Sequence, residues 1–207
     1  MKTRCRSHLL IIALLSLCVT ILPALSEQAH ADELRPTATA TLVSSTGQIE
    51  TITLEEIKAP YRSASTEQSK TYEASVYTAR NSNLTLSAND TDSSLSARAY
   101  ITIGYEKTSD DYVLLKQVSG RWTILDQSVT AGKLAKVNYG CTSAVVGSTQ
   151  ARQMSVTNNF GFTTGFSEMV PISAGTMGAN LTVGLSHGSS NWSFTVDATL
   201  MNNMPGM

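Results

Sequence analysis

The sequence predicts an all-β protein, and three observations support this fold class. From residue 35 onward, threonine and serine alternate with valine, isoleucine and leucine, and β-branched residues fit a pleated surface with one exposed side. Clusters of glycine, proline, asparagine and aspartate interrupt these runs at roughly 8–12-residue intervals, which is typical of antiparallel strands. No run after residue 31 keeps a helical period with caps. We therefore expect an antiparallel β-sandwich, with Ig-like and jelly-roll-like topologies both open.

The first 31 residues have the parts of an export signal. Basic residues at positions 2, 4 and 6 precede an apolar run at 9–25, and a small–x–small triplet ends at Ala31. We predict a signal helix that is cleaved after Ala31, as in bacterial export, and a secreted or cell-surface product. The apolar run is shorter than the roughly 20 residues of a membrane span. Cys18 lacks the small preceding residue of a lipidation motif. Cleavage is therefore favoured over a retained anchor or a lipidated cysteine.

The exported portion has the length of about one domain, since cleavage leaves 176 of the 207 residues. Of the 15 basic and 16 acidic residues, three basic ones and Glu27 leave with the signal, so 12 and 15 remain and the net charge is −3. So small an imbalance gives no basic surface for nucleic acid or anionic lipid. We expect no nucleic-acid partner, and no membrane partner after cleavage.

We divide the exported chain into an N-terminal hairpin with a linker, residues 32–69, and a β-sandwich domain, residues 70–207. Ala38–Val43 and Ile49–Leu54 are two β-rich runs joined by a short loop that contains Gly47, so we predict a hairpin. The polar, small residues that follow at 60–70 are typical of a loop. The sequence leaves open whether 32–69 is an extension or the first edge of the domain.

The sandwich domain begins with alternating runs separated by asparagine- and aspartate-rich clusters. We expect one hairpin to join 112–118 to 121–125 through Ser119-Gly120, because glycine readily takes the positive φ of a tight turn. Other strands are expected at residues 71–78, 84–88, 95–105, 134–139, 153–157 and 160–162.

The regular alternation of residues 181–200 predicts a second hairpin. Apolar and polar residues alternate on both sides of the loop at 187–190, which is typical of strands with one buried and one wet face. The same alternation places Trp122 and Trp192 on the apolar face of their strands, so we expect both in the core.

The candidate catalytic residues are Cys141 and His187, the one cysteine and the one histidine that remain after cleavage. A lone cysteine forms no intramolecular disulfide, and a single imidazole excludes zinc sites with two or three histidines. A histidine base could activate the thiol if the two side chains met. The sequence around Cys141 has no helix N-terminus that would lower the pKa of the thiol. We therefore favour a buried cysteine and a loop histidine.

Two sets of residues are candidates for binding. Asp90 and Asp92 alternate as in a calcium loop, but the glycine and the closing glutamate of an EF-hand are missing. A solvated turn is the favoured interpretation there, so we expect no metal and no cofactor. Tyr77, Tyr105 and Tyr139 are the candidates for an exposed aromatic platform that stacks on sugar rings.

The sequence carries no motif that identifies a family, so the functional hypothesis depends on compartment and composition. We expect a secreted or cell-surface interaction module without catalytic activity, whose partner is an extracellular protein or a glycan surface. One alternative is a secreted hydrolase that acts on an extracellular polymer through Cys141 and His187. A second alternative is a self-assembling or membrane-active protein, for which residues 181–200 are the best-fitting segment. The ligand and the oligomeric state stay open.

Overall fold

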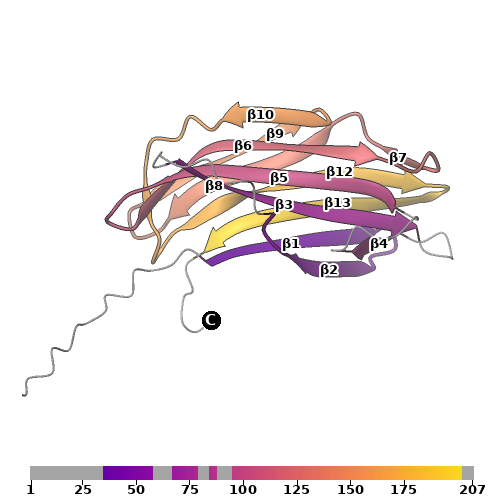
Figure 1. The fold of residues 1–207 in the computed structure, drawn as a ribbon, viewed down its shortest axis with the longest axis horizontal. Helices are drawn as coiled ribbons and strands as arrows, with labels where there is room; N and C mark the ends of the chain where they lie inside the picture. The colour runs from indigo at the N-terminus through magenta and orange to yellow at the C-terminus, as the bar shows by residue number, and fades with distance from the viewer. Residues whose placement is uncertain (1–34, 58–66, 79–83, 88–94, 202–207) are drawn as a thin grey trace, which may run out of the picture. The chain divides into compact units, whose positions relative to one another are not determined.

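The computed structural model describes residues 35–57, 67–78, 84–87 and 95–201, all within one compact unit. Every regular element in these residues is a β-strand (Figure 1), and none of them is a helix able to span a membrane. The expected signal helix lies outside the described residues. The strands are β1 (Arg35–Ser44), β2 (Ile49–Leu54), β3 (Glu67–Thr78), β4 (Leu84–Ser87), β5 (Leu95–Lys107), β6 (Tyr112–Ile124), β7 (Val129–Ala131), β8 (Ala135–Ser143), β9 (Ser148–Val156), β10 (Asn159–Thr163), β11 (Val170–Pro171), β12 (Thr176–His187) and β13 (Ser190–Met201).

The strands form two antiparallel sheets, which confirms the predicted all-β class. The first sheet has the order β2-β1-β13-β12-β8-β9, with β7 also pairing with β12. The second has the order β10-β6-β5-β3-β4, with β11 beside β6. The predicted N-terminal hairpin is present, because β1 pairs with β2 and Gly47 in the connection has a φ of +84°. Strand β1 also pairs with β13, so this hairpin is part of the first sheet.

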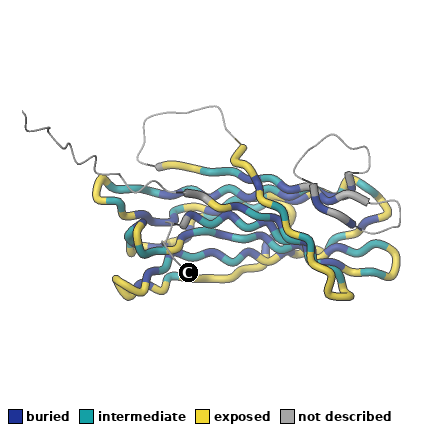
Figure 2. The backbone as a smooth tube through the Cα atoms, turned by 90° about the horizontal axis from the view of Figure 1, so that it is seen from below, coloured by how far each residue is buried: buried dark blue, intermediate teal, exposed yellow. Residues whose placement is uncertain are grey.

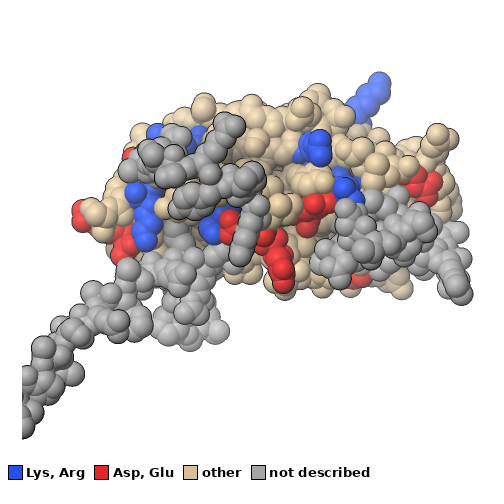
Figure 3. Space-filling model, in the orientation of Figure 1, with Lys and Arg blue, Asp and Glu red and all other residues tan. Residues whose placement is uncertain are grey.

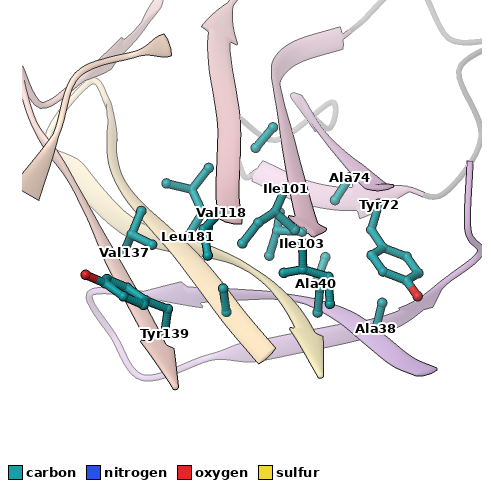
Figure 4. Packing of buried hydrophobic residues seen from close by; sticks show 14 of the residues in the cluster. Ala38, Ala40, Tyr72, Ala74, Ile101, Ile103, Val118, Val137, Tyr139 and Leu181 are labelled. Carbon is teal, nitrogen blue, oxygen red and sulfur yellow. The ribbon is translucent and has the colours of Figure 1, made fainter. Parts of the chain in front are cut away.

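One hydrophobic core joins the two sheets. Strands β12 and β13 contact β5 and β6, and the buried apolar side chains of both sheets belong to one cluster. Figure 4 shows Ala40 and Leu181 of the first sheet beside Ile101, Ile103 and Val118 of the second. Along the strands, buried residues alternate with partly exposed ones (Figure 2), so each sheet turns one face to the core and the other outward.

The predicted hairpin at Ser119-Gly120 is wrong, because β6 runs without interruption through these residues. Gly120 has a different role. A Cβ atom at Gly120 would lie 2.5 Å from the carbonyl oxygen of Tyr100 and 2.8 Å from Cζ of Phe160, so the residue allows close packing between strands. The chain turns before β6 instead, where Asp111 has a φ of +57°. Aspartate is one of the few non-glycine residues that adopt this conformation readily.

The predicted hairpin near the C-terminus is confirmed. Strands β12 and β13 pair along their whole length, up to His187 opposite Ser190, and Gly188 in the two-residue turn has a φ of +59°. The expected burial of both tryptophans is also confirmed, since Trp122 is 5% and Trp192 is 8% exposed. The alternation of apolar and polar residues therefore predicted the buried face of these strands correctly.

Candidate functional site

The structure does not bring Cys141 and His187 together. Cys141 lies opposite Met177 on β12, and His187 is at the far end of the same strand. The separation along β12 is ten residues, about 33 Å at the rise of an extended strand. Cys141 is fully buried, its Sγ atom donates to the carbonyl of Val113 at 3.7 Å, and burial raises the pKa of the thiol. The two side chains therefore do not form a thiol–imidazole pair in the structure, and Cys141 is buried, as the sequence favours.

Two tyrosines of the expected aromatic platform are in the core. Tyr105 is 1% exposed and donates its hydroxyl hydrogen to Oε1 of Gln68 at 2.7 Å. Tyr139 is 8% exposed, and its ring centroid lies 5.0 Å from that of Phe162. Both rings point inward because strand alternation places them on the core side. These two residues therefore offer no open face to a sugar, contrary to expectation.

The structure does not describe the side chains of the other candidate binding residues. The side chain of Tyr77 lies outside the described residues, as do Asp90 and Asp92. Within the described ranges, no group of three or more histidine, cysteine, aspartate or glutamate side chains is placed to hold a metal ion.

The outer face of the second sheet carries charges of both signs. Figure 3 shows lysine and arginine mixed with aspartate and glutamate on the side where β3, β5 and β6 face the viewer. Two of the contacts on this face are ion pairs and a third places a guanidinium group over an aromatic ring. The contacts join Arg98 to Glu73 at 2.8 Å, Arg121 to the ring of Tyr100 at 4.9 Å, and Lys116 to Glu106 at 3.7 Å.

The outer face of the first sheet differs, because its side chains are mainly hydroxyls and amides held in register across six strands. We call this surface the hydroxyl–amide face. Two neighbouring rows define it. The first row is Thr53, Thr39, Asp197, Asn180, Asn138 and Gln153. The second row is Thr51, Thr41, Thr195, Thr182, Lys136 and Ser155.

Three amide side chains form a ladder along the first row. Nε2 of Gln153 donates to Oδ1 of Asn138 at 2.6 Å, and Nδ2 of Asn138 donates to Oδ1 of Asn180 at 2.9 Å. Each amide nitrogen carries two hydrogens, so these contacts leave further N–H groups for a ligand. The donors point from the β9 edge toward Asp197, whose Oδ1 accepts from the hydroxyl of Thr199 at 2.6 Å. The ladder therefore presents ordered donors beside one carboxylate.

A row of mostly small residues lies next to the amide ladder. Ala151, Gly140, Gly178 and Thr199 are in register across β9, β8, β12 and β13. A groove of about 430 Å³ lies over them, and we call it the glycine trough. One wall is the amide ladder with Asp197, and the other is formed by threonines, of which Thr142 and Thr176 line the groove. It crosses four strands, a length of about 14 Å at the usual strand spacing.

The two glycines of the trough have different structural constraints. A Cβ atom at Gly178 would lie 2.4 Å from the carbonyl oxygen of Ala198, so close packing on β13 requires glycine there. At Gly140 the nearest atom would be the carbonyl oxygen of Gln150 at 3.2 Å, so the backbone of β9 would have to give by a few tenths of an ångström. Gly184 lies on the same face, away from the trough, and a Cβ atom there would meet nothing within 4 Å. Gly140 and Gly184 thus form a matched pair for experiments.

A second hollow lies on the other sheet. The pairing of β5 with β6 shifts between Gly104 and Tyr105, and a cleft of about 450 Å³ opens at this irregularity. Lys116 lines the cleft, but its ammonium group faces Glu106. Bulges often accompany binding sites, although the paired charges give this cleft no clear ligand preference.

Sequence reasoning missed the glycine trough. Asn138, Gly140 and Thr142 alternate on one strand, and Gly178, Asn180 and Thr182 alternate on another, so each half of the pattern was visible. The pairing of β8 with β12 brings the halves together across about 40 residues of chain. Comparison of this chain with family models, with curated proteins and with solved structures finds no match in any of the three.

Proposed function

We propose that this protein is a secreted β-sandwich module that binds an uncharged extracellular glycan in the glycine trough, without catalysis. The observation that carries the proposal is the amide ladder along one wall of the trough. Sugar hydroxyls donate and accept at once, and amides and hydroxyls offer both partners at the spacing of neighbouring strands. A predominantly uncharged lining favours a neutral ligand over an acidic one.

The two ends of the amide ladder support this choice of ligand. Asp197 and Thr199 lie at the β13 end of the trough, and a carboxylate accepts stronger hydrogen bonds than a neutral group. Gln153 lies at the β9 end, where the trough reaches the edge of the sheet. A linear glycan could therefore lie across the strands, with one side on the ladder and the other on Thr142 and Thr176.

The expected affinity is modest. Each hydrogen bond to a ligand adds only about 0.5–1.5 kcal/mol net, and the trough offers a few of them to each sugar ring. The ring of Tyr139 points into the core, so it gives the trough no stacking area. We expect a dissociation constant of about 0.1–1 mM for a short oligosaccharide, or about 4–5.5 kcal/mol of binding free energy.

A comparison of two threonine variants tests the proposal. An array of neutral and acidic glycans identifies a ligand, and isothermal titration calorimetry measures its affinity. Gly140→Thr places a branched side chain in the trough and should weaken binding at least about tenfold, a loss of about 1.4 kcal/mol. Gly184→Thr adds the same group to the same face and should bind as the wild type does. Circular dichroism checks that both variants fold.

Three results would contradict this function. They are binding to no glycan, binding to acidic glycans alone, and equal affinity of the Gly140→Thr and Gly184→Thr variants.

Export is a separate part of the proposal. The mass of the protein recovered outside the cell should match a chain that begins at Asp32, and an intact N-terminus on that protein would contradict cleavage after Ala31.

A further inference from the structure

We propose that a second copy of this chain pairs with the first through β9, so that the two first sheets become one continuous sheet. Strand β9 is an edge strand, because within the described sheets it pairs with β8 alone. Edge strands commonly carry prolines, bulges or several charges that prevent such pairing. Strand β9 has no proline, its nine-residue register with β8 has no shift, and Arg152 is its one charged residue.

Arg152 is exposed, but its charged group is engaged by the segment that follows β10. Its Nη1 atom donates to the carbonyl of Thr164 at 3.2 Å, and its guanidinium group lies 5.5 Å from the ring centroid of Phe166. Gln150 is held in a similar way, since its Oε1 atom accepts from the N–H groups of Ser167 and Glu168. These contacts fix β9 in an extended form, which lowers the entropic cost of pairing.

A two-fold axis through Ala151, perpendicular to the sheet, gives a self-complementary register. Arg152 then lies opposite Gln150 of the second copy, whereas an axis through Arg152 would place two arginines face to face. Like charges directly opposite each other destabilise a strand pair. Met154, which is 37% exposed, lies opposite Ser148 of the second copy.

The same register also joins the two glycine troughs, because Ala151 is the residue at which each trough reaches the edge. The joined trough would cross eight strands, about 34 Å at the usual strand spacing. This consequence rests on the proposed glycan function, whereas the dimer itself does not. A strand pair of this length buries less than a standard interface of about 800 Å² per partner, so we expect weak association, with a dissociation constant of about 10–100 μM.

Charged variants of Ala151 test the register, and sedimentation velocity measures association without any glycan. The wild type should shift from monomer to dimer as its concentration rises. Ala151→Lys and Ala151→Glu should each stay monomeric, because each would place two like charges opposite each other. An equal mixture of the two should associate, since lysine then faces glutamate. Ala151→Gln, the neutral control, should associate as the wild type does.

The proposal is overturned by a wild type that stays monomeric at about 1 mM, by association of Ala151→Lys alone, or by a mixture that stays monomeric. Circular dichroism of each variant shows that the fold is intact. Failure of the dimer and failure of the glycan function are distinguishable. A monomer that binds glycan contradicts the dimer alone, and a dimer that binds no glycan contradicts the function alone.

Discussion

Phe160 on β10 lies directly opposite Gly120 on β6, and its ring covers the position that a side chain at Gly120 would occupy. Tyr100 of β5 closes the same position from the other side with its carbonyl oxygen. The missing side chain allows the ring of Phe160 to pack against the core at the edge of the second sheet. An aromatic ring over a strand glycine is a known means of holding an edge strand in place.

Gly120→Ala should therefore destabilise the protein by about 1–3 kcal/mol, the usual cost of overpacking. The added methyl group would meet a backbone oxygen at 2.5 Å, and that atom cannot move without shifting β5. Urea denaturation measures the change in the free energy of unfolding. Gly184→Ala is the control, because its methyl group meets no atom within 4 Å. Equal stabilities of the two variants would contradict the packing role of Gly120.

This glycine also shows why part of the fold could not be predicted from the sequence. Gly120 and Gly188 both follow polar residues between β-rich runs, yet Gly188 turns the chain and Gly120 lies within a strand. Local alternation predicted the strands and their buried faces, including Trp122 and Trp192. It could not distinguish a glycine that turns the chain from a glycine that lets a neighbouring strand pack closely. That difference depends on β10, which comes about 40 residues later.

The candidate site was less predictable than the fold. The glycine trough depends on pairing between strands that are distant in the sequence, and alternation carries no information on such pairing. The same limit explains why alternation could not show that Cys141 and His187 lie beside opposite ends of β12. Residue type alone suggests Tyr105 and Tyr139 as an aromatic platform, although alternation places both on the core side.

The Cys141 thiol should be unreactive in the folded protein. It is fully buried, and burial raises the pKa of the thiol, so little reactive thiolate forms near neutral pH. We expect an aromatic disulfide reagent to modify no thiol in the folded exported protein at about pH 8, and one thiol per chain in denaturant. Absorbance of the released thiolate measures the reaction. Rapid modification of the folded protein would contradict the burial of Cys141.

Stability should fall at high pH, partly through Tyr105. Burial, with a further contribution from the charge of Glu56, raises the pKa of Tyr105 from 10.0 to about 12. The folded state therefore keeps a proton that the unfolded state loses. The contribution of Tyr105 to stability is complete below about pH 10 and is lost as the pH rises toward about 12.

Urea denaturation at about pH 9 and about pH 11 measures this loss, and Tyr105→Phe should show a smaller fall because it has no phenol to ionise. Burial also raises the pKa of Tyr72, so part of the fall should remain in this variant. The control is Tyr112→Phe, which changes a partly exposed phenol at the start of β6. A fall in Tyr105→Phe as large as that of the wild type would contradict the role of Tyr105.

Thr164→Val should destabilise the protein by about 1–3 kcal/mol, although the two side chains have the same shape. The buried hydroxyl of Thr164 donates to the carbonyl of Leu115 at 2.6 Å and accepts from the N–H group of Phe166 at 3.2 Å. Valine leaves both backbone groups without this partner. Thr163→Val is the matched control, because Thr163 is the adjacent residue on β10 and is exposed. Urea denaturation should show a loss for Thr164→Val that is larger by at least about 1 kcal/mol. Equal losses would contradict the proposal that the hydroxyl holds the segment after β10 in place. The same segment carries the Thr164 carbonyl that accepts from Arg152.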